Sequence, residues 1–262
     1  MNENGICEII RMSPRKESPN MNNKKNGFTL VELLVVIGIL GILMGALFPA
    51  ISAAMLSAQT SAMSMRGRNL FVAITQCNTE REGAGLQAVW PQSDTEGLDD
   101  DDKQVIGASS STDFFKYLFD LDTDAKSRKS FVDVDVGVLS GGGVPGMTGS
   151  TLQNKNVAWL VTQNIQSEVA DVVPVLVTRN VDYSTLQGNL KQYDGTTTTE
   201  IECGKAGGEN NSTPFGNKAW ILVRKSGGAQ VIKAKYSKLN VIFNRQSFDN
   251  SSLANDLTIL PL

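Results

Sequence analysis

The residue of this sequence that most needs a chemical explanation is Glu32, a carboxylate inside an apolar run. The run extends from Phe28 to Ile51, and Glu32 is the only charged residue among its 24 residues. A carboxylate costs about 2.5–3.5 kcal/mol at the centre of a membrane-spanning helix, and charged residues in such helices usually have a partner. Glu32 lies about one turn from the start of the run, so its cost there is smaller. Its presence still predicts an interaction with a positively charged group.

Three aspartates at alternate positions, Asp120, Asp122 and Asp124, are the weak candidates for a metal site. Carboxylate oxygens suit calcium, but an EF-hand loop needs glycine at its sixth position and glutamate at its twelfth. Here these positions hold Ala125 and Phe131. The sequence therefore favours a solvated loop and no cofactor, with an irregular calcium site as the alternative.

The sequence contains no histidine. This excludes Ser-His-Asp and Cys-His catalysis and histidine metal sites, and it favours a protein that is not an enzyme. Of the three cysteines, Cys7 lies in the N-terminal segment, which leaves Cys77 and Cys203 as a pair. In an oxidising compartment this pair is compatible with one disulfide, and the alternative is two buried free thiols.

Charge is distributed unevenly along the chain. The whole sequence has a net charge of −3, whereas residues 1–27 hold five basic and three acidic residues. Basic residues before an apolar span hold that end in the cytoplasm, so the rest of the chain is expected in the periplasm. The acidic balance of that remainder gives no reason to expect nucleic acid as a partner.

The apolar run is long enough to cross a membrane. As a helix its 24 residues would extend roughly 36 Å, against a hydrocarbon core of about 30 Å. Residues that favour helices continue beyond it, which predicts one helix over 28–82 with its membrane part at about 28–51. Pro49 is expected to kink this helix. Gly41 and Gly45 have the spacing of helices that pack closely in lipid.

Residues 83–262 are expected to form one soluble α+β domain with a mainly antiparallel sheet, following a cleaved leader at 1–27 and the long helix. A short helix is predicted within 109–121, and a hairpin within 218–236 that turns at Gly227-Gly228. Strict alternation predicts a half-buried strand at 131–139. A second strand, at 172–181, is expected at a sheet edge because Pro174 cannot donate to a ladder. The run Asp99–Asp102 is interpreted as a solvated turn.

The segment NGFTLVELLVVIGIL resembles the N-terminal cleavage and methylation motif of type IV pilins and type II secretion pseudopilins. The resemblance rests on the basic leader, Gly27, Phe28, the residues Thr29-Leu30-Val31, Glu32 and the apolar run that follows. It covers about residues 21–70. An ordinary signal peptide has an apolar core of about 7–15 residues, and a simple signal-anchor gives Glu32 no role. The segment from Met21 is itself a compact basic leader, so translation from either Met1 or Met21 is compatible with the sequence.

The resemblance implies a processing and assembly route. A prepilin peptidase would cut between Gly27 and Phe28, and the new amine of Phe28 would be N-methylated. In a filament that amine would pair with Glu32 of a neighbouring subunit. The implied partners are other pilin-like subunits, prepilin peptidase, an inner-membrane assembly platform and membrane lipid.

Three functions follow from this reading of the sequence. The first is a structural subunit of a type II secretion pseudopilus, anchored by one span in the inner membrane with its soluble domain in the periplasm. The second is a type IV pilus subunit for adhesion, motility or DNA uptake. The third, from another class, is a membrane-anchored periplasmic binding domain that never polymerises.

Overall fold

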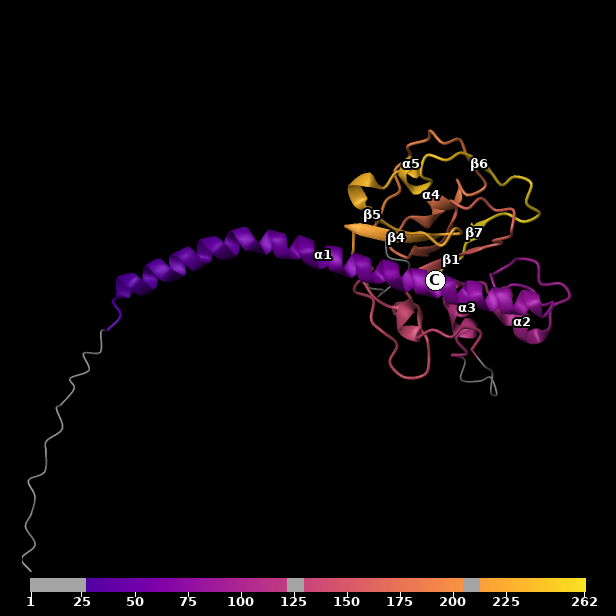
Figure 1. The fold of residues 1–262 in the computed structure, drawn as a ribbon, viewed down its shortest axis with the longest axis horizontal. Coiled ribbons are helices and arrows are strands. Elements are labelled where there is room, and N and C mark those ends of the chain that lie inside the picture. The colour runs from indigo at the N-terminus through magenta and orange to yellow at the C-terminus, as the bar shows by residue number, and fades with distance from the viewer. Residues whose placement is uncertain (1–26, 122–129, 205–212) are drawn as a thin grey trace, which may run out of the picture. The chain divides into compact units, whose positions relative to one another are not determined.

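A computed structural model describes residues 27–121, 130–204 and 213–262 of the chain (Figure 1). The chain forms two units that divide after Pro49. The N-terminal unit ends at Pro49, and the C-terminal unit comprises Ala50–Leu262. The first helix contributes to both units.

Helix α1 extends from Leu30 to Gly83 and contains 54 residues. Alanine, leucine and methionine, which favour helices, recur along it. Pro49 lies inside α1, and the helix continues through it. The expected long helix is therefore confirmed, whereas the kink at Pro49 stays a prediction.

The C-terminal unit is built on an antiparallel sheet of five strands in the order β5-β4-β2-β1-β7. Trp159 of β1 is opposite Thr178 of β2, and Ala219 of β4 is opposite Lys233 of β5. The five strands are β1 (Trp159–Gln163), β2 (Pro174–Thr178), β4 (Ala219–Arg224), β5 (Ala229–Lys233) and β7 (Thr258–Ile259). The α+β class with a mainly antiparallel sheet is thus confirmed.

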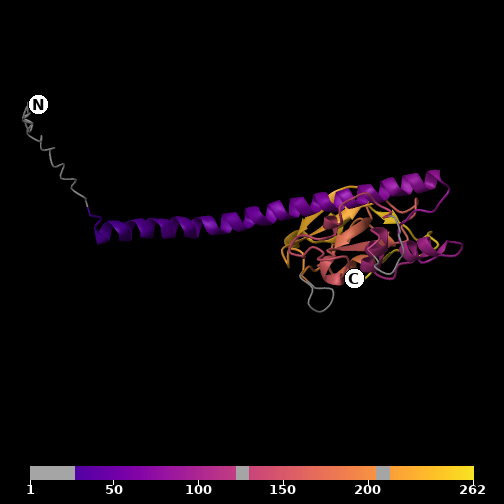
Figure 2. The same ribbon diagram turned by 90° about the horizontal axis from the view of Figure 1, so that it is seen from below.

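The second half of α1 packs on this sheet at a point of very close approach (Figure 2). A Cβ atom placed on Gly67 would lie 2.5 Å from Cη2 of Trp159 and 2.9 Å from Cγ2 of Val223. Both of these side chains are buried, as are Leu70 and Ile74 one and two turns further along the helix. Glycine is therefore the residue that lets the helix lie directly on the tryptophan ring.

Shorter elements complete the described chain. They are α2 (Asp100–Ile106), α3 (Ser111–Leu118), α4 (Tyr183–Gln187) and α5 (Leu239–Ile242), the 3-10 helices η1 (Val136–Leu139), η2 (Asn154–Asn156) and η3 (Ala234–Tyr236), and the two-stranded pair β3 (Gln192–Tyr193) with β6 (Phe248–Asp249). Helix α3 and the β4-β5 hairpin were both expected from the sequence and are confirmed. Ser110 caps α3, since its hydroxyl accepts a hydrogen bond from the amide of Asp113 at 3.0 Å.

The predicted edge position of the strand around Pro174 is wrong. Strand β2 is the middle strand of the five, with β4 on one side and β1 on the other. Proline is tolerated here because it is the first residue of the strand, and the register shifts between Pro174 and Leu176.

The predicted strand at 131–139 is also wrong. This segment has no strand partner among the described residues, and it ends in the 3-10 helix η1. The carboxylate of Asp135 accepts a hydrogen bond from the amide of Gly137 at 2.7 Å, which turns the chain. Val132 and Val138 are buried, so the alternating valines contact the core without a ladder.

The run of aspartates is not a solvated turn. Asp99 is the N-cap of α2, and its carboxylate accepts a hydrogen bond from the amide of Asp102 at 2.8 Å. Asp102 is buried and forms an ion pair with Arg81 of α1 at 2.6 Å. The acidic residues thus begin a helix, where negative charge complements the helix dipole.

Candidate functional site: the N-terminal processing and assembly segment

The peptide bond between Gly27 and Phe28 lies just before the start of α1. Residues 27–29 are neither helical nor part of a strand, and α1 begins at Leu30. The side chain of Phe28 is 81% exposed, and nothing lies within 4 Å of a Cβ placed on Gly27. A peptidase that binds extended backbone could therefore reach this bond without unwinding the helix.

Thr29 and Glu32 form a reciprocal hydrogen-bonded pair at the start of α1. The hydroxyl of Thr29 accepts a hydrogen bond from the amide of Glu32 at 3.2 Å. Oε2 of Glu32 accepts two hydrogen bonds from Thr29, one from its backbone amide and one from its hydroxyl, both at 2.8 Å. This is a capping box, in which residues three apart satisfy the free amides of a helix start.

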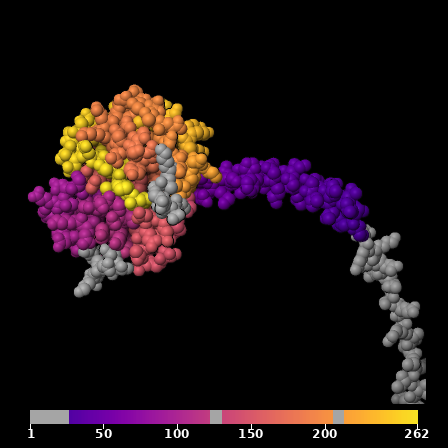
Figure 3. Space-filling model, turned by 180° about the vertical axis from the view of Figure 1, so that it is seen from behind, coloured from indigo at the N-terminus to yellow at the C-terminus, as the bar shows by residue number. Residues whose placement is uncertain are grey.

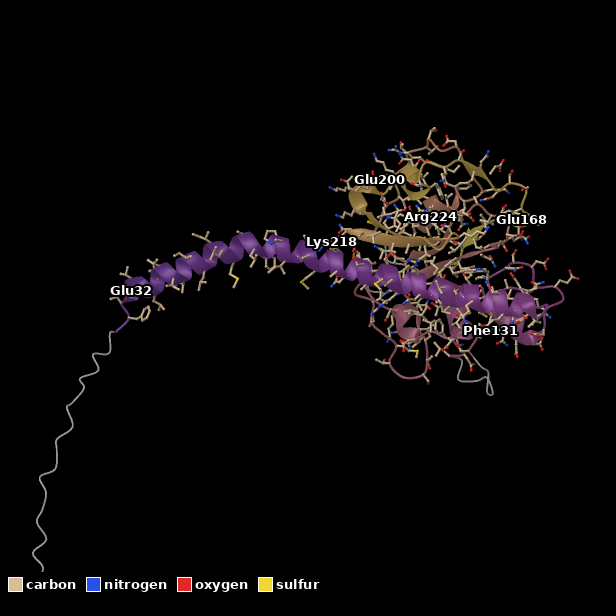
Figure 4. All side chains as sticks on the ribbon, in the orientation of Figure 1. Glu32, Phe131, Glu168, Glu200, Lys218 and Arg224 are labelled. Atoms are coloured by element: carbon tan, nitrogen blue, oxygen red, sulfur yellow. The ribbon has the colours of Figure 1, made fainter. Side chains whose placement is uncertain are left out.

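The capping box holds the Glu32 carboxylate in one orientation and engages only one of its oxygens. Both hydrogen bonds from Thr29 go to Oε2, and no described residue donates to Oε1. Glu32 is labelled at the start of α1 in Figure 4. The second oxygen is therefore available to a cation that comes from outside the described chain.

The apolar side chains of the first part of α1 are exposed throughout. Their exposed fractions range from 47% at Val36 to 79% at Leu30. No described residue of this chain covers them, and the helix is long and apolar enough to span a membrane. Such a segment is suited to contact with lipid or with other apolar helices. These properties fit a protein anchored in the inner membrane.

Cys77 and Cys203 are free cysteines in the structure. Cys77 is buried on α1. Cys203 is half-buried, and its backbone forms an isolated antiparallel β-bridge with that of Val181. The two cysteines therefore belong to different surroundings. Burial raises the pKa of both thiols, which lowers their reactivity as thiolates.

The candidate metal site gains no support from the described residues. Asp120 lies two residues after the end of α3, and its backbone is left-handed, with a φ of 54°. Asp122 and Asp124 lie outside the described residues, so the cluster of three cannot be placed. Elsewhere in the described ranges no group of three or more acidic, cysteine or histidine side chains could hold a metal ion.

Sequence reasoning identified Glu32 and the bond between Gly27 and Phe28 but gave Thr29 no role of its own. The signal was present in the spacing, because threonine followed three residues later by glutamate is the pattern of a capping box. It is easy to overlook here, because the same residues lie at the edge of an apolar span.

Comparison with known proteins gives one match. The family model described as the prokaryotic N-terminal methylation motif matches residues 22–48. No curated protein and no solved structure matches the chain. The matched residues include the exposed bond before Phe28, the capping box and the apolar first part of α1. The chain therefore carries the signature of the type IV pilin and pseudopilin family, and its α+β architecture is pilin-like.

Proposed function

We propose that the chain is a pseudopilin of a type II secretion system. In this proposal, prepilin peptidase cuts between Gly27 and Phe28, and the amine of Phe28 is then N-methylated. The mature chain of 235 residues waits in the inner membrane with its C-terminal unit in the periplasm. An assembly platform then builds it into a short filament that moves proteins outward. The chain is a structural subunit and a substrate of the peptidase, not an enzyme.

The observation that carries this proposal is the state of the Glu32 carboxylate. The capping box satisfies Oε2 within the chain and leaves Oε1 without a donor among the described residues. The group that cleavage creates is a cationic amine on Phe28. In a filament, where apolar helices exclude water and lipid, an unpaired charge is costly, so each carboxylate needs such a cation. Cleavage therefore supplies the partner that assembly requires.

The same features would serve a type IV pilus subunit, so the experiment has two stages. The first stage compares the wild-type chain with Glu32→Leu in the native host. Glu168→Leu is the matched control, because Glu168 is an exposed glutamate of the C-terminal unit. Intact mass and terminal sequencing should find N-methylated Phe28 at the start of all three chains. Filaments should form from wild type and Glu168→Leu but not from Glu32→Leu.

An uncleaved wild-type chain would overturn the proposal, and so would a Glu32→Leu chain that assembles normally. The latter result would favour a membrane-anchored domain that acts alone. The second stage deletes either the secretin of a type II system or the ATPase that retracts type IV pili. Loss of secreted proteins on deletion of this chain and of the secretin alike supports the pseudopilin. If deletion of this chain instead removes surface pili, and twitching motility is lost both in that strain and in the strain without the retraction ATPase, the chain belongs to a type IV pilus.

A further inference from the structure

The C-terminal unit contains a long segment without acidic residues. Residues 213–248 hold seven basic residues and no aspartate or glutamate, in a chain whose net charge is −3. Arg224 is half-buried and donates to the carbonyl of Ile242 at 2.8 Å, and Lys225 donates to the carbonyls of Ser167 and Val169. Two of the seven therefore have structural roles, and the others are exposed.

Four of the exposed lysines gather at the end of the β4-β5 hairpin that is opposite its turn. The backbone amide of Ala234 donates to the carbonyl of Lys218 at 3.0 Å, and β-pairing places Lys233 opposite Ala219. Figure 4 labels Lys218 at this place. We call the four lysines the basic surface: Lys218, Lys233, Lys235 and Lys238.

The basic surface includes an exposed aromatic ring. Tyr236 is 54% exposed, and the ammonium group of Lys235 lies 4.7 Å from the centre of its ring. None of the four lysines forms an ion pair with a described residue. Glu200, which bridges Lys238 through the backbone, is an exposed acidic neighbour. One carboxylate against four ammonium groups leaves the surface strongly positive.

A second segment has the opposite charge. Residues 80–103 hold eight acidic and two basic residues. Asp102 is buried and its charge is paired with that of Arg81. Seven other acidic residues are exposed, and we call them the acidic surface: Glu80, Glu82, Asp94, Glu96, Asp99, Asp100 and Asp101.

The two surfaces lie at opposite ends of the part of α1 that belongs to the C-terminal unit. Lys218 lines a hollow together with Ser52 and Gln59, near the beginning of this part. The acidic surface surrounds the last turn, where Arg81 holds α2. The roughly 22 residues between Gln59 and Arg81 correspond to about 33 Å of helix. In the space-filling view of Figure 3, the colours of residues 100–110 and of 215–240 occupy separate parts of the C-terminal unit. The surfaces cannot meet within one chain.

We propose that the basic surface docks on the acidic surface of a second copy of this chain. This inference rests on the proposed function, because it names a contact between subunits of the filament. The contact is heterologous: each copy offers one surface forward and the other backward, so the interaction repeats without closing. Tyr236 adds an apolar contact to the charge pairs, and the contact weakens as salt screens the charges.

The charges of the chain favour its own copy over other acidic partners. The acidic surface carries seven exposed carboxylates and the basic surface four ammonium groups, and the two surfaces lie at opposite ends of the part of α1 in the C-terminal unit. A long polyanion such as DNA would also meet the rest of a chain whose net charge is negative. The experiment below also tests binding of the basic surface to nucleic acid and to anionic lipid.

The test reverses the charges of each surface in the native host. Lys233→Glu with Lys235→Glu should lower the assembled fraction about tenfold, because repulsion replaces several weak attractions. Glu96→Lys with Asp100→Lys should have the same effect. Lys155→Glu is the control, because Lys155 is exposed, lies outside 213–248 and, like the four lysines, forms no ion pair with a described residue. Terminal sequencing and thermal unfolding verify that each variant is processed and folded.

The decisive variant carries all four reversals. It exchanges the signs of both surfaces, so the proposal expects assembly to return to within about twofold of wild type. In filaments, Lys235→Cys with Asp100→Cys should also give a ladder of disulfide-linked multimers, which neither single cysteine variant gives.

The proposal is overturned if wild-type filaments form and the reversed variants assemble equally well, or if the fourfold variant is not rescued. If the variant of the two lysines instead loses binding to DNA or to anionic vesicles while filaments stay intact, the basic surface serves that ligand. Failure of the wild-type chain to form any filament would refute the proposed function itself, which separates the two results.

Discussion

Replacement of Gly67 by alanine tests whether α1 must lie directly on the sheet of the C-terminal unit. The added methyl group would meet Cη2 of Trp159 at 2.5 Å, Cζ2 of the same ring at 2.9 Å and Cγ2 of Val223 at 2.9 Å. Carbon atoms in contact normally lie about 3.5–4.0 Å apart, so each of the three contacts is too short. The ring cannot easily move, because it is fully buried and its indole nitrogen donates to the carbonyl of Val138 at 3.0 Å.

Two effects of opposite sign determine the result. Alanine favours the helix over glycine by up to about 1 kcal/mol. Overpacking a core costs about 1–3 kcal/mol, and three contacts this short place Gly67 in the upper part of that range. We therefore expect Gly67→Ala to lower the free energy of unfolding by about 1–2 kcal/mol. For a unit of this size the melting temperature should fall by roughly 2–8 °C.

Calorimetry or circular dichroism of the purified mature chain in detergent measures this change. Gly83→Ala is the control, because it lies on the same helix with nothing within 4 Å of its added Cβ, and it should not be destabilising. In the double variant Gly67→Ala with Trp159→Phe, the smaller ring should relieve part of the strain, so the two effects should not add. A Gly67→Ala chain as stable as the Gly83→Ala control would refute the close contact of α1 with Trp159.

Two further predictions concern titratable groups. Under non-reducing conditions, Cys77 and Cys203 should both be alkylated once the chain is unfolded. In the folded chain, buried Cys77 should react more slowly than Cys203. An intact mass 2 Da below that of the dithiol would show a disulfide and contradict the prediction of free thiols. Hydrogen bonds from the amides of Thr197 and Thr196 hold the pKa of Asp194 well below its ordinary value of about 3.9. The ionised carboxylate of Asp194 therefore stabilises the folded chain above about pH 4, and this stabilisation is lost progressively as the pH falls below about 4. Asp194→Asn should therefore lower the melting temperature at pH 6 and lower it less at pH 3. If the melting temperatures of wild type and variant differ by the same amount at both pH values, the charge of Asp194 does not contribute.

Local residue patterns were sufficient for the elements whose interactions lie within a few residues of chain. The β4-β5 hairpin needs only two apolar runs and the turn at Gly227, and it was predicted correctly. Helix α3 was likewise marked by its cap at Ser110. The strand at 172–181 was identified, but its place in the sheet was not. The chemistry of Pro174 describes one residue, whereas the position of β2 depends on which strands lie on either side of it.

The wrong predictions share a physical cause. The alternating valines of 131–139 contact the core, yet a strand also requires a partner that the sequence does not reveal. The aspartate run looked solvated because Arg81, which pairs with Asp102, is about twenty residues away in sequence. In both cases a distant segment decided the local conformation.

By itself, the sequence identified the candidate processing and assembly segment of this protein. The bond before Phe28, Glu32 and the apolar span lie within consecutive residues, and a helix positions neighbours along its own axis. Only the tertiary structure decided the order of the sheet, the separate surroundings of Cys77 and Cys203, and the placement of Lys218 and Asp102 at opposite ends of the part of α1 in the C-terminal unit. These features depend on contacts between residues far apart in the chain, which no local pattern of residue types specifies.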